Sequence, residues 1–276
     1  MREEKLKSLL LLAGSLFLAV FSLAPFVYMV ATSLSADPHF LAARAHFEFT
    51  WEHYYSILTV KSLHFLDYQV NSLIVSASSA LAAVLIASLA AFAVTRLDWP
   101  GKAAVMLFVV AVSMFPQICL ISYLFKFMGA VGLIDTYPAL VLPYIAWTLP
   151  LSLWVLVSYF AGIPRDLDRA ATVDGCSRVQ VLRRVILPVA RPGVFSALLL
   201  AFIFAYNEFL LALMLTTDHH ARTIPVGIAF FEGLHGQVLW GEITAAASFS
   251  TLPLVVLILV FQRHIMQGLT MGAIKG

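Results

Sequence analysis

Six stretches of this chain run for 20 or more residues, five without any charged side chain and one with a single glutamate. A helix of about 20 apolar residues crosses the hydrocarbon core of a bilayer, so each stretch is long enough to do so. The pattern predicts an all-α membrane protein with six transmembrane helices. The predicted spans are residues 8–36, 68–95, 103–125, 136–164, 192–217 and 243–262.

The composition agrees with a membrane protein and argues against several other classes. Hydrophobic residues make up 61% of the chain and charged residues only 12%, whereas soluble domains carry about 25% charged residues. The net charge of +2 is too small to indicate nucleic-acid binding. Cys119 lies in an apolar span and Cys176 in a charged segment, so we expect no disulfide between them.

The orientation follows from the distribution of lysine and arginine. With the N-terminus in the cytoplasm, residues 1–7, 96–102, 165–191 and 263–276 lie inside and carry 3, 2, 6 and 2 of these side chains. The total of 13, out of 17 in the chain, fits the rule that cytoplasmic loops are rich in positive charge. Both termini are therefore predicted to be cytoplasmic. The first span has 29 uncharged residues, more than the apolar region of about 7–15 in a signal peptide, so we expect it to be retained.

Residues 165–191 form an island of charge, RDLDRAATVDGCSRVQVLRRVILPVAR, between two apolar spans. Apolar residues recur within it at helical spacing, which predicts two short amphipathic helices. Asp166 and Ser177 are expected to cap the starts of the two helices. Gly175 suits the end of the first helix, where the backbone needs a positive φ.

Pro188 and Pro192 are predicted to stop the second helix of this segment, because proline cannot continue the hydrogen-bond ladder. From the residues alone, two interpretations of the segment stay open. It either docks a partner protein or lies as a solvated loop on the lipid headgroups.

The sequence RAATVDG, followed after nine residues by VILP, is similar to the EAA motif of binding-protein-dependent ABC transporter permeases. The acid before the glycine matches the sugar-importer branch. Two positions depart from the motif, since Arg169 stands in place of its glutamate and Val185 in place of its isoleucine. An acid, Asp168, stands one position earlier. The resemblance implies an ATPase-coupling site made of Asp168, Arg169, Ala170, Ala171, Asp174, Gly175, Leu187 and Pro188.

The resemblance implies the fold and role of a type I ABC importer permease of the carbohydrate, maltose/trehalose-type branch. The expected function is a permease subunit that couples closure of the ATPases to alternating access for a di- or oligosaccharide. The implied partners are a second related permease in a heterodimer, two cytoplasmic ABC ATPases and an extracytoplasmic sugar-binding protein. No cofactor is implied for this chain, because ATP and Mg lie on the ATPases. The implied location is the cytoplasmic (inner) membrane of a bacterium or archaeon.

The expected division of the chain follows from the same likeness, which covers everything from the second helix to the end. Residues 1–67 hold the first transmembrane helix and an outer loop. Residues 68–262 form the permease core with five transmembrane helices, including the coupling loop 165–191. Residues 263–276 form a cytoplasmic tail.

The tail resembles the end of the maltose-type inner permease, which reaches toward the ATPase pair. The alternative is a frayed terminus. The matching residues, expected to contact an ATPase, are Gly268, Leu269, Thr270, Gly272 and Lys275.

Three polar residues inside the spans, Gln117, Asn207 and Glu208, are candidates for a substrate pathway. Glu208 is the one charge within the predicted spans, and a buried ionisable group in lipid costs at least about 2–3 kcal/mol, so it is expected to face the bundle interior or a water-filled passage. Two roles stay open for it, lining the path or bonding helices at a subunit interface. Gln117 follows Pro116, which is either a structural kink or part of a substrate contact.

Prolines also interrupt the fourth predicted span, at Pro138, Pro143 and Pro150. Each proline removes one backbone donor and crowds the preceding turn of a helix. The outer half of this span is therefore expected to be irregular.

Sequence signatures of catalysis are missing. The chain has no G-x-x-x-x-G-K-[ST] phosphate loop, G-x-S-x-G, H-E-x-x-H or paired intramembrane carboxylates, so it is not expected to be an enzyme or to hydrolyse ATP. The histidines, including His219 and His220, show no i, i+4 pairing and are interpreted as solvated, with no metal site.

The main competing hypothesis is a secondary transporter driven by an ion gradient. Such transporters commonly have internal repeats and several polar or ionisable groups at the membrane midplane. Here one charge and no obvious repeat are found, which favours the ABC importer. A membrane-embedded enzyme is a third hypothesis, disfavoured because no catalytic constellation is present.

Overall fold

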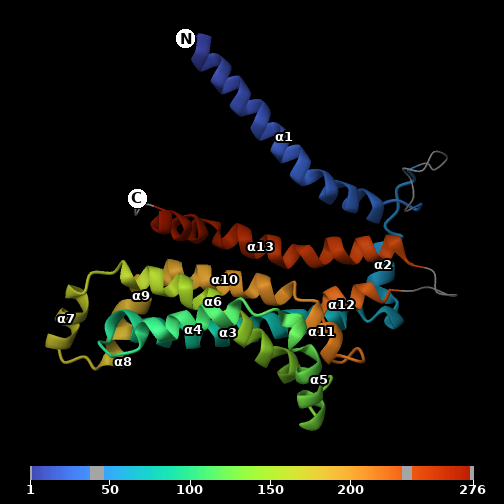
Figure 1. Cartoon of the computed structure of the whole chain (residues 1–276). Helices are drawn as coiled ribbons and strands as arrows, with labels where there is room; N and C mark the ends of the chain where they lie inside the picture. The colour runs from blue at the N-terminus through green and yellow to red at the C-terminus, as the bar shows by residue number, and fades with distance from the viewer. Residues whose placement is uncertain (1, 38–46, 232–237, 274–276) are drawn as a thin grey trace. The chain divides into compact units, whose positions relative to one another are not determined.

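The computed structural model describes residues 2–37, 47–231 and 238–273, with side chains described over 7–37, 47–231 and 238–262. The described residues are mostly helical, and an isolated antiparallel bridge joins Ser35 and Phe49 (Figure 1). The predicted all-α fold is confirmed.

Helical segments follow one another along the described parts of the chain. They are α1 (Arg2–Ser33), α2 (Glu52–Thr59), η1 (Lys61–Leu63), α3 (Phe65–Arg96), α4 (Lys102–Ser113), η2 (Gln117–Cys119), α5 (Ile121–Ala130), α6 (Tyr137–Ala161), α7 (Asp166–Val173), α8 (Arg178–Val181), the π-helical turn η3 (Leu182–Ile186), α9 (Leu187–Val189), α10 (Arg191–Tyr206), α11 (Leu210–Leu215), α12 (Ile224–Ala229) and α13 (Trp240–Ala273).

Four of the six predicted spans are confirmed as single helices long and apolar enough to cross a membrane. They cover Lys7–Ser33, Lys61–Arg96, Tyr137–Ala161 and Trp240–Gln262. The other two predicted spans are each divided, the third between α4 and α5 and the fifth between α10 and α11. The number of six crossings therefore stays a prediction.

The chain forms two compact units. Unit 1 consists of Met1–Leu66 and Ile228–Leu252, and unit 2 of Asp67–Gly227 and Pro253–Gly276, so α13 contributes to both. The division into 1–67, 68–262 and 263–276 expected from the sequence stays a prediction.

In unit 1, polar contacts fasten α2 to its neighbours. The hydroxyls of Ser33 and Tyr54 lie 2.8 Å apart, and His53 Nε2 lies 3.1 Å from the carbonyl oxygen of Ser35. The other ring nitrogen of His53 lies 3.5 Å from Glu242 Oε1, at the start of α13. These contacts hold the end of α1, α2 and the first turn of α13 together.

In unit 2, small residues allow long helices to approach closely. Every fourth residue of α3, at Ser79, Ala83, Ala87 and Ala91, is fully buried. Along α10, a similar stripe of small residues runs through Gly193, Ala197, Ala201 and Ala205. Such stripes let membrane helices pack backbone to backbone. A Cβ at Gly193 would lie 2.3 Å from the ring of Tyr159, so only glycine fits where α10 meets α6.

Helix α6 forms the centre of unit 2, since both α4 and α10 pack against it. The expectation of an irregular outer half is wrong, because α6 runs unbroken from Tyr137 to Ala161 with Pro143 and Pro150 inside it. Pro138 lies in the first turn, where no backbone donor is needed. The two internal prolines are accommodated because packed neighbours and nearby hydroxyl groups can satisfy the freed carbonyls of a membrane helix.

Candidate functional site

The segment 165–191 folds into two short helical pieces at one end of unit 2, with α5 and α11 toward the other end (Figure 1). Its first helix, α7, begins at Asp166 after an N-cap residue, Arg165, that has no side-chain cap. The prediction that Asp166 caps α7 is wrong. The backbone is already helical at Arg165, so Asp166 lies inside the first turn, and its carboxylate pairs with Arg169 at 3.2 Å.

The turn between the two pieces agrees with the sequence. Gly175 has a φ of +84° and follows the end of α7, while the amide of Cys176 donates to the carbonyl of Ala171 at 2.9 Å. Ser177 and Gln180 then form a reciprocal capping box at the start of α8. The predicted glycine turn and serine cap are confirmed.

The second piece is longer than expected. It runs through α8, the π turn η3 and α9 to Val189, and then bends by 82° into α10. The helix does end between the two predicted prolines, at Val189, but Pro188 lies inside it and does not stop it. The π turn widens the helix directly before Pro188, which accommodates a residue without an N–H. Pro192 follows the end of this helix and lies in the first turn of α10, where no backbone donor is needed.

The segment has one apolar face that is anchored in the core of unit 2, where Ala171, Val181, Leu182 and Ile186 are buried. Other large apolar side chains of the segment are exposed, and Val173 is 87% accessible. They are Leu167, Val173, Val179 and Val189.

The residues that match the EAA motif divide between these two environments. Ala171 is buried, Asp168, Leu187 and Pro188 are partly buried, and Arg169, Ala170, Asp174 and Gly175 are exposed. Their role in contacting an ATPase stays a prediction.

Arg96, the last residue of α3, is a contact of this segment that the sequence did not single out. Its Nε lies 3.2 Å from Asp168 Oδ2. Its Nη2 donates to the carbonyls of Phe160 at 2.7 Å and Ile163 at 2.8 Å, at the end of α6. Arg165 donates to the carbonyl of Thr95 at 3.1 Å. The sequence places Arg96 in a positively charged inner turn, RLDWPGK, but does not indicate Asp168 as its partner.

Glu208 and Asn207 lie where α10 gives way to α11. Glu208 is buried and accepts hydrogen bonds from the Tyr144 hydroxyl at 2.6 Å and from the amides of Leu211 and Ala212 at 2.8 and 3.1 Å. Its carboxylate thus caps the start of α11 and ties it to α6. Asn207 is exposed, and its side-chain amide donates to the carbonyl of Ile203.

Gln117 also lies in a helix break, within η2, and is partly buried. An apolar cavity of about 560 Å³ lies beside this break, between α4, α5 and α6, and its lining includes Phe115, Leu120 and Trp147. The three proposed pathway residues do not line it. Their assignment to a substrate pathway stays a prediction.

Within the tail, Gly268, Leu269, Thr270 and Gly272 belong to the last turns of α13, in a part whose side chains lie outside the described residues. Lys275 lies outside the described residues altogether. A contact between the tail and an ATPase stays a prediction.

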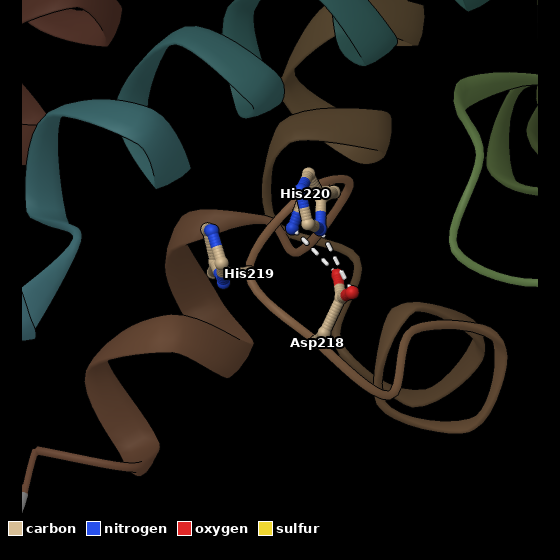
Figure 2. Close-up of side chains that lie close together, drawn as sticks. All are labelled: Asp218, His219 and His220. Carbon is tan, nitrogen blue, oxygen red and sulfur yellow. Dashed lines mark hydrogen bonds and ion pairs between the residues drawn. The ribbon is translucent and has the colours of Figure 1, made fainter.

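The loop between α11 and α12 brings three potential metal ligands together. Figure 2 shows Asp218 and His220 turned toward one another, and the ligand atoms of Asp218, His219 and His220 lie within 4.8 Å of one another. The carboxylate of Asp218 already accepts from the amide of His220 and lies 2.8 Å from its Nδ1. These contacts lower the pKa of Asp218, the backbone amide having the largest effect. The interpretation of these histidines as solvated, with no metal, stays a prediction.

A polar frame holds this loop. Asp135, with a φ of +61°, accepts from the amides of Thr217 and Asp218 at 2.5 and 3.0 Å. Asn71 donates to the carbonyls of His219 and Arg222. The loop is therefore fixed to the first turns of α3 and to the connection between α5 and α6.

Comparison with known proteins identifies the class. Residues 67–271 match the family model described as binding-protein-dependent transport system inner membrane component, and the chain belongs to this family. It is therefore the membrane-embedded permease subunit of a transport system, and it has no catalytic role of its own. The family membership decides against the ion-gradient-driven secondary transporter.

Individual relatives lie within the same family. The chain is 50% identical over 277 residues to the trehalose/maltose transport system permease protein MalG of Thermococcus litoralis, covering all of both chains. It is 44% identical over 208 residues to the trehalose transport system permease protein SugB of Mycobacterium tuberculosis, covering 75% of this chain and 76% of SugB. Among solved structures, a chain of a bacterial ABC transporter involved in the import of alginate matches with a TM-score of 0.80 at 17% identity, covering 95% of this chain and 98% of that one. This last likeness shows the fold.

Proposed function

We propose that this chain is the permease subunit of an ATP-driven importer for a disaccharide of the trehalose or maltose type. The observation that carries the proposal is the segment 165–191, with one face anchored in unit 2 and exposed apolar side chains on both sides of a glycine turn. The names of two relatives, one of which matches over its full length, support the choice of sugar.

In the proposed mechanism, α7 binds in a surface cleft of a cytoplasmic ABC ATPase. ATP closes a pair of ATPases, α7 moves with one of them, and the transmembrane helices tip from an inward-open to an outward-open state. A transported sugar then enters from an extracytoplasmic binding protein, and hydrolysis resets the bundle. Such a cycle needs two packings of the helices close in energy, which the ATPases bias through their contact.

The proposed assembly contains this chain, a second related permease, two ATPases that hold ATP and Mg, and a sugar-binding protein. The name of one neighbour in structure, an alginate transporter in complex with a periplasmic protein, fits this composition. The residues we propose for contact with the ATPases are those of α7 and its turn, with Leu187 and Pro188 in the second helical piece. In this arrangement the segment 165–191 and both termini face the cytoplasm.

Uptake of labelled trehalose and maltose by cells that lack this chain, with and without its return on a plasmid, tests the proposal. The chain should restore uptake of one of the two sugars. Uptake should stop when the ATPase is inactivated by mutation and persist for a short time when an ionophore collapses the ion gradients. Uptake that needs the gradients and survives ATPase inactivation would overturn the proposal.

A further inference from the structure

The ion pair of Arg96 and Asp168 joins three elements of unit 2. Arg96 ends α3, Asp168 lies in the first turn of α7, and the same guanidinium holds the two carbonyls at the end of α6. The last carbonyls of a helix have no partner within the helix, so a basic side chain placed there supplies the missing donors. A single side chain thus connects α7 to two predicted membrane spans.

Burial makes this connection stiff. The Arg96 side chain is only 5% exposed and that of Asp168 20%. A charge held that far from water is stable only while it is paired and hydrogen-bonded. The planar guanidinium also fixes the directions of the two carbonyls to which it donates, which a lysine ammonium does not.

The second ion pair of α7 lacks these properties. Arg169 and Asp166 lie 3.2 Å apart, but their side chains are 79% and 87% exposed. Pairs in water contribute little and are screened by salt. The acid that faces into unit 2 is therefore Asp168, while Arg169, which stands in place of the motif glutamate, faces outward.

We propose that Arg96 is a positioning residue that transmits displacement of α7 to α3 and α6. The inference rests on the proposed function, in which an ATPase moves α7. When α7 is displaced, separating Asp168 from Arg96 would leave a buried charge unpaired, so the ends of α3 and α6 move with it. Because α6 also carries Tyr144, which binds Glu208, the same displacement reaches the break between α10 and α11.

The test uses the complete transporter, purified with its ATPases and reconstituted with the binding protein and sugar in proteoliposomes. Asp168→Asn removes the charge from the pair, and Asp168→Glu keeps it. The quantities to measure are ATP hydrolysis, sugar uptake and their ratio, at equal amounts of assembled complex. We expect Asp168→Asn to lower sugar uptake per ATP hydrolysed about tenfold, in the range of measured coupling between sites. Asp168→Glu should restore most of the ratio.

A matched control removes another ion pair from the neighbouring turn. Lys102 and Asp98 lie 3.3 Å apart, and Asp98 is largely exposed. Lys102→Ala should leave uptake per ATP unchanged, because this pair does not connect α7 to the spans.

The outcomes separate this inference from the proposed function. An unchanged ratio in Asp168→Asn, with normal ATP-driven uptake by the wild type, overturns the role of Arg96 and leaves the proposed function standing. A wild type without ATP-driven uptake overturns both. If Asp168→Asn fails to assemble, Arg96→Lys decides, since it keeps the charge but loses the planar fork; a lowered ratio supports the inference and a wild-type ratio overturns it.

Discussion

At the scale of single residues, Gly175 sets the turn between α7 and α8. Its φ is +84°, and a Cβ added there would meet nothing within 4 Å. Substitution therefore acts through the backbone alone, and a side chain in the left-handed region costs about 1–2 kcal/mol. We expect Gly175→Val to keep ATP hydrolysis in the assembled transporter while sugar uptake falls, because α7 no longer holds its angle.

The control for this variant is Gly175→Asn, since asparagine tolerates positive φ better than other residues with a side chain. It should transport nearly as well as the wild type. Normal uptake by Gly175→Val would contradict the proposed geometry of the turn.

The Glu208 side chain contributes to the stability of the fold, and the size of its contribution follows from its hydrogen bonds. Glu208→Ala leaves the Tyr144 hydroxyl and the amides of Leu211 and Ala212 without an acceptor. Each buried donor left without a partner costs about 1–3 kcal/mol. The midpoint of thermal unfolding in detergent should fall by about 5 °C or more.

Asn207→Ala is the matched control for stability, because Asn207 is exposed and bonds only to a carbonyl of its own helix in the contacts described for it. Its unfolding midpoint should stay close to that of the wild type. Equal midpoints for Glu208→Ala and the wild type would show that Glu208 does not hold α11 in place.

These residues also show what the sequence can and cannot predict. Gly175 and Ser177 were predicted correctly, because a turn and a capping box depend on residues within a few positions. The contacts of Glu208 and Arg96 were not predicted, because their partners are Tyr144 and Asp168, which are distant in the sequence. In a sequence, a positively charged residue at the end of a span indicates how the chain is oriented in the membrane. It does not indicate which side chains that residue contacts in the fold.

At the scale of elements, the lengths of the apolar stretches predict the positions of the helices. They do not predict where two of the stretches are interrupted. The span 192–217 reads as one apolar run, yet it is divided after Tyr206, where the Glu208 carboxylate supplies the acceptor that begins α11. The π turn before Pro188 was likewise not predicted, because it depends on how α8 and α9 pack on the core of unit 2.

The exposed apolar side chains of α7 give a prediction for docking. Leu167 and Val173 are exposed apolar side chains outside the described core of unit 2. If α7 contacts an ATPase, Leu167→Ser with Val173→Ser should lower the amount of ATPase that copurifies with the chain. Val131→Ser, which changes an exposed valine outside the segment, is the control and should have no effect.

The Asp218 turn gives a prediction about pH. Hydrogen bonds from His220 lower the pKa of Asp218 below its usual value, which is about 4 for a free carboxyl group. A lowered pKa in the folded state means that the contribution of the turn is fully present above the usual value and is lost as the pH falls through the lowered one. Amide exchange of residues 217–222, corrected for intrinsic rates, should stay constant from neutral pH down to about 5 and increase in stronger acid.

Asp218→Ala is the variant that isolates this effect. It should exchange faster at neutral pH and lose the part of the acid response that belongs to Asp218. Equal exchange in the variant and the wild type at neutral pH would show that the carboxylate does not hold the turn.

At the scale of the whole molecule, the chain is one component of a transport system. Its family consists of inner membrane components of binding-protein-dependent transport systems. The segment 165–191 presents apolar side chains to water at the end of unit 2, and exposed apolar patches commonly mark sites of contact with other proteins. We therefore expect partner proteins to bind this segment.

The most direct test is gentle purification of the chain from its native membrane, followed by measurement of the mass and stoichiometry of the complex. The account predicts one copy of a second, related permease and two ATPase chains for each copy of this chain. Loss of the ATPases from a variant with Leu167→Ser and Val173→Ser would assign their contact to α7. Recovery of the chain alone, or as a homo-oligomer without ATPases, would contradict the account.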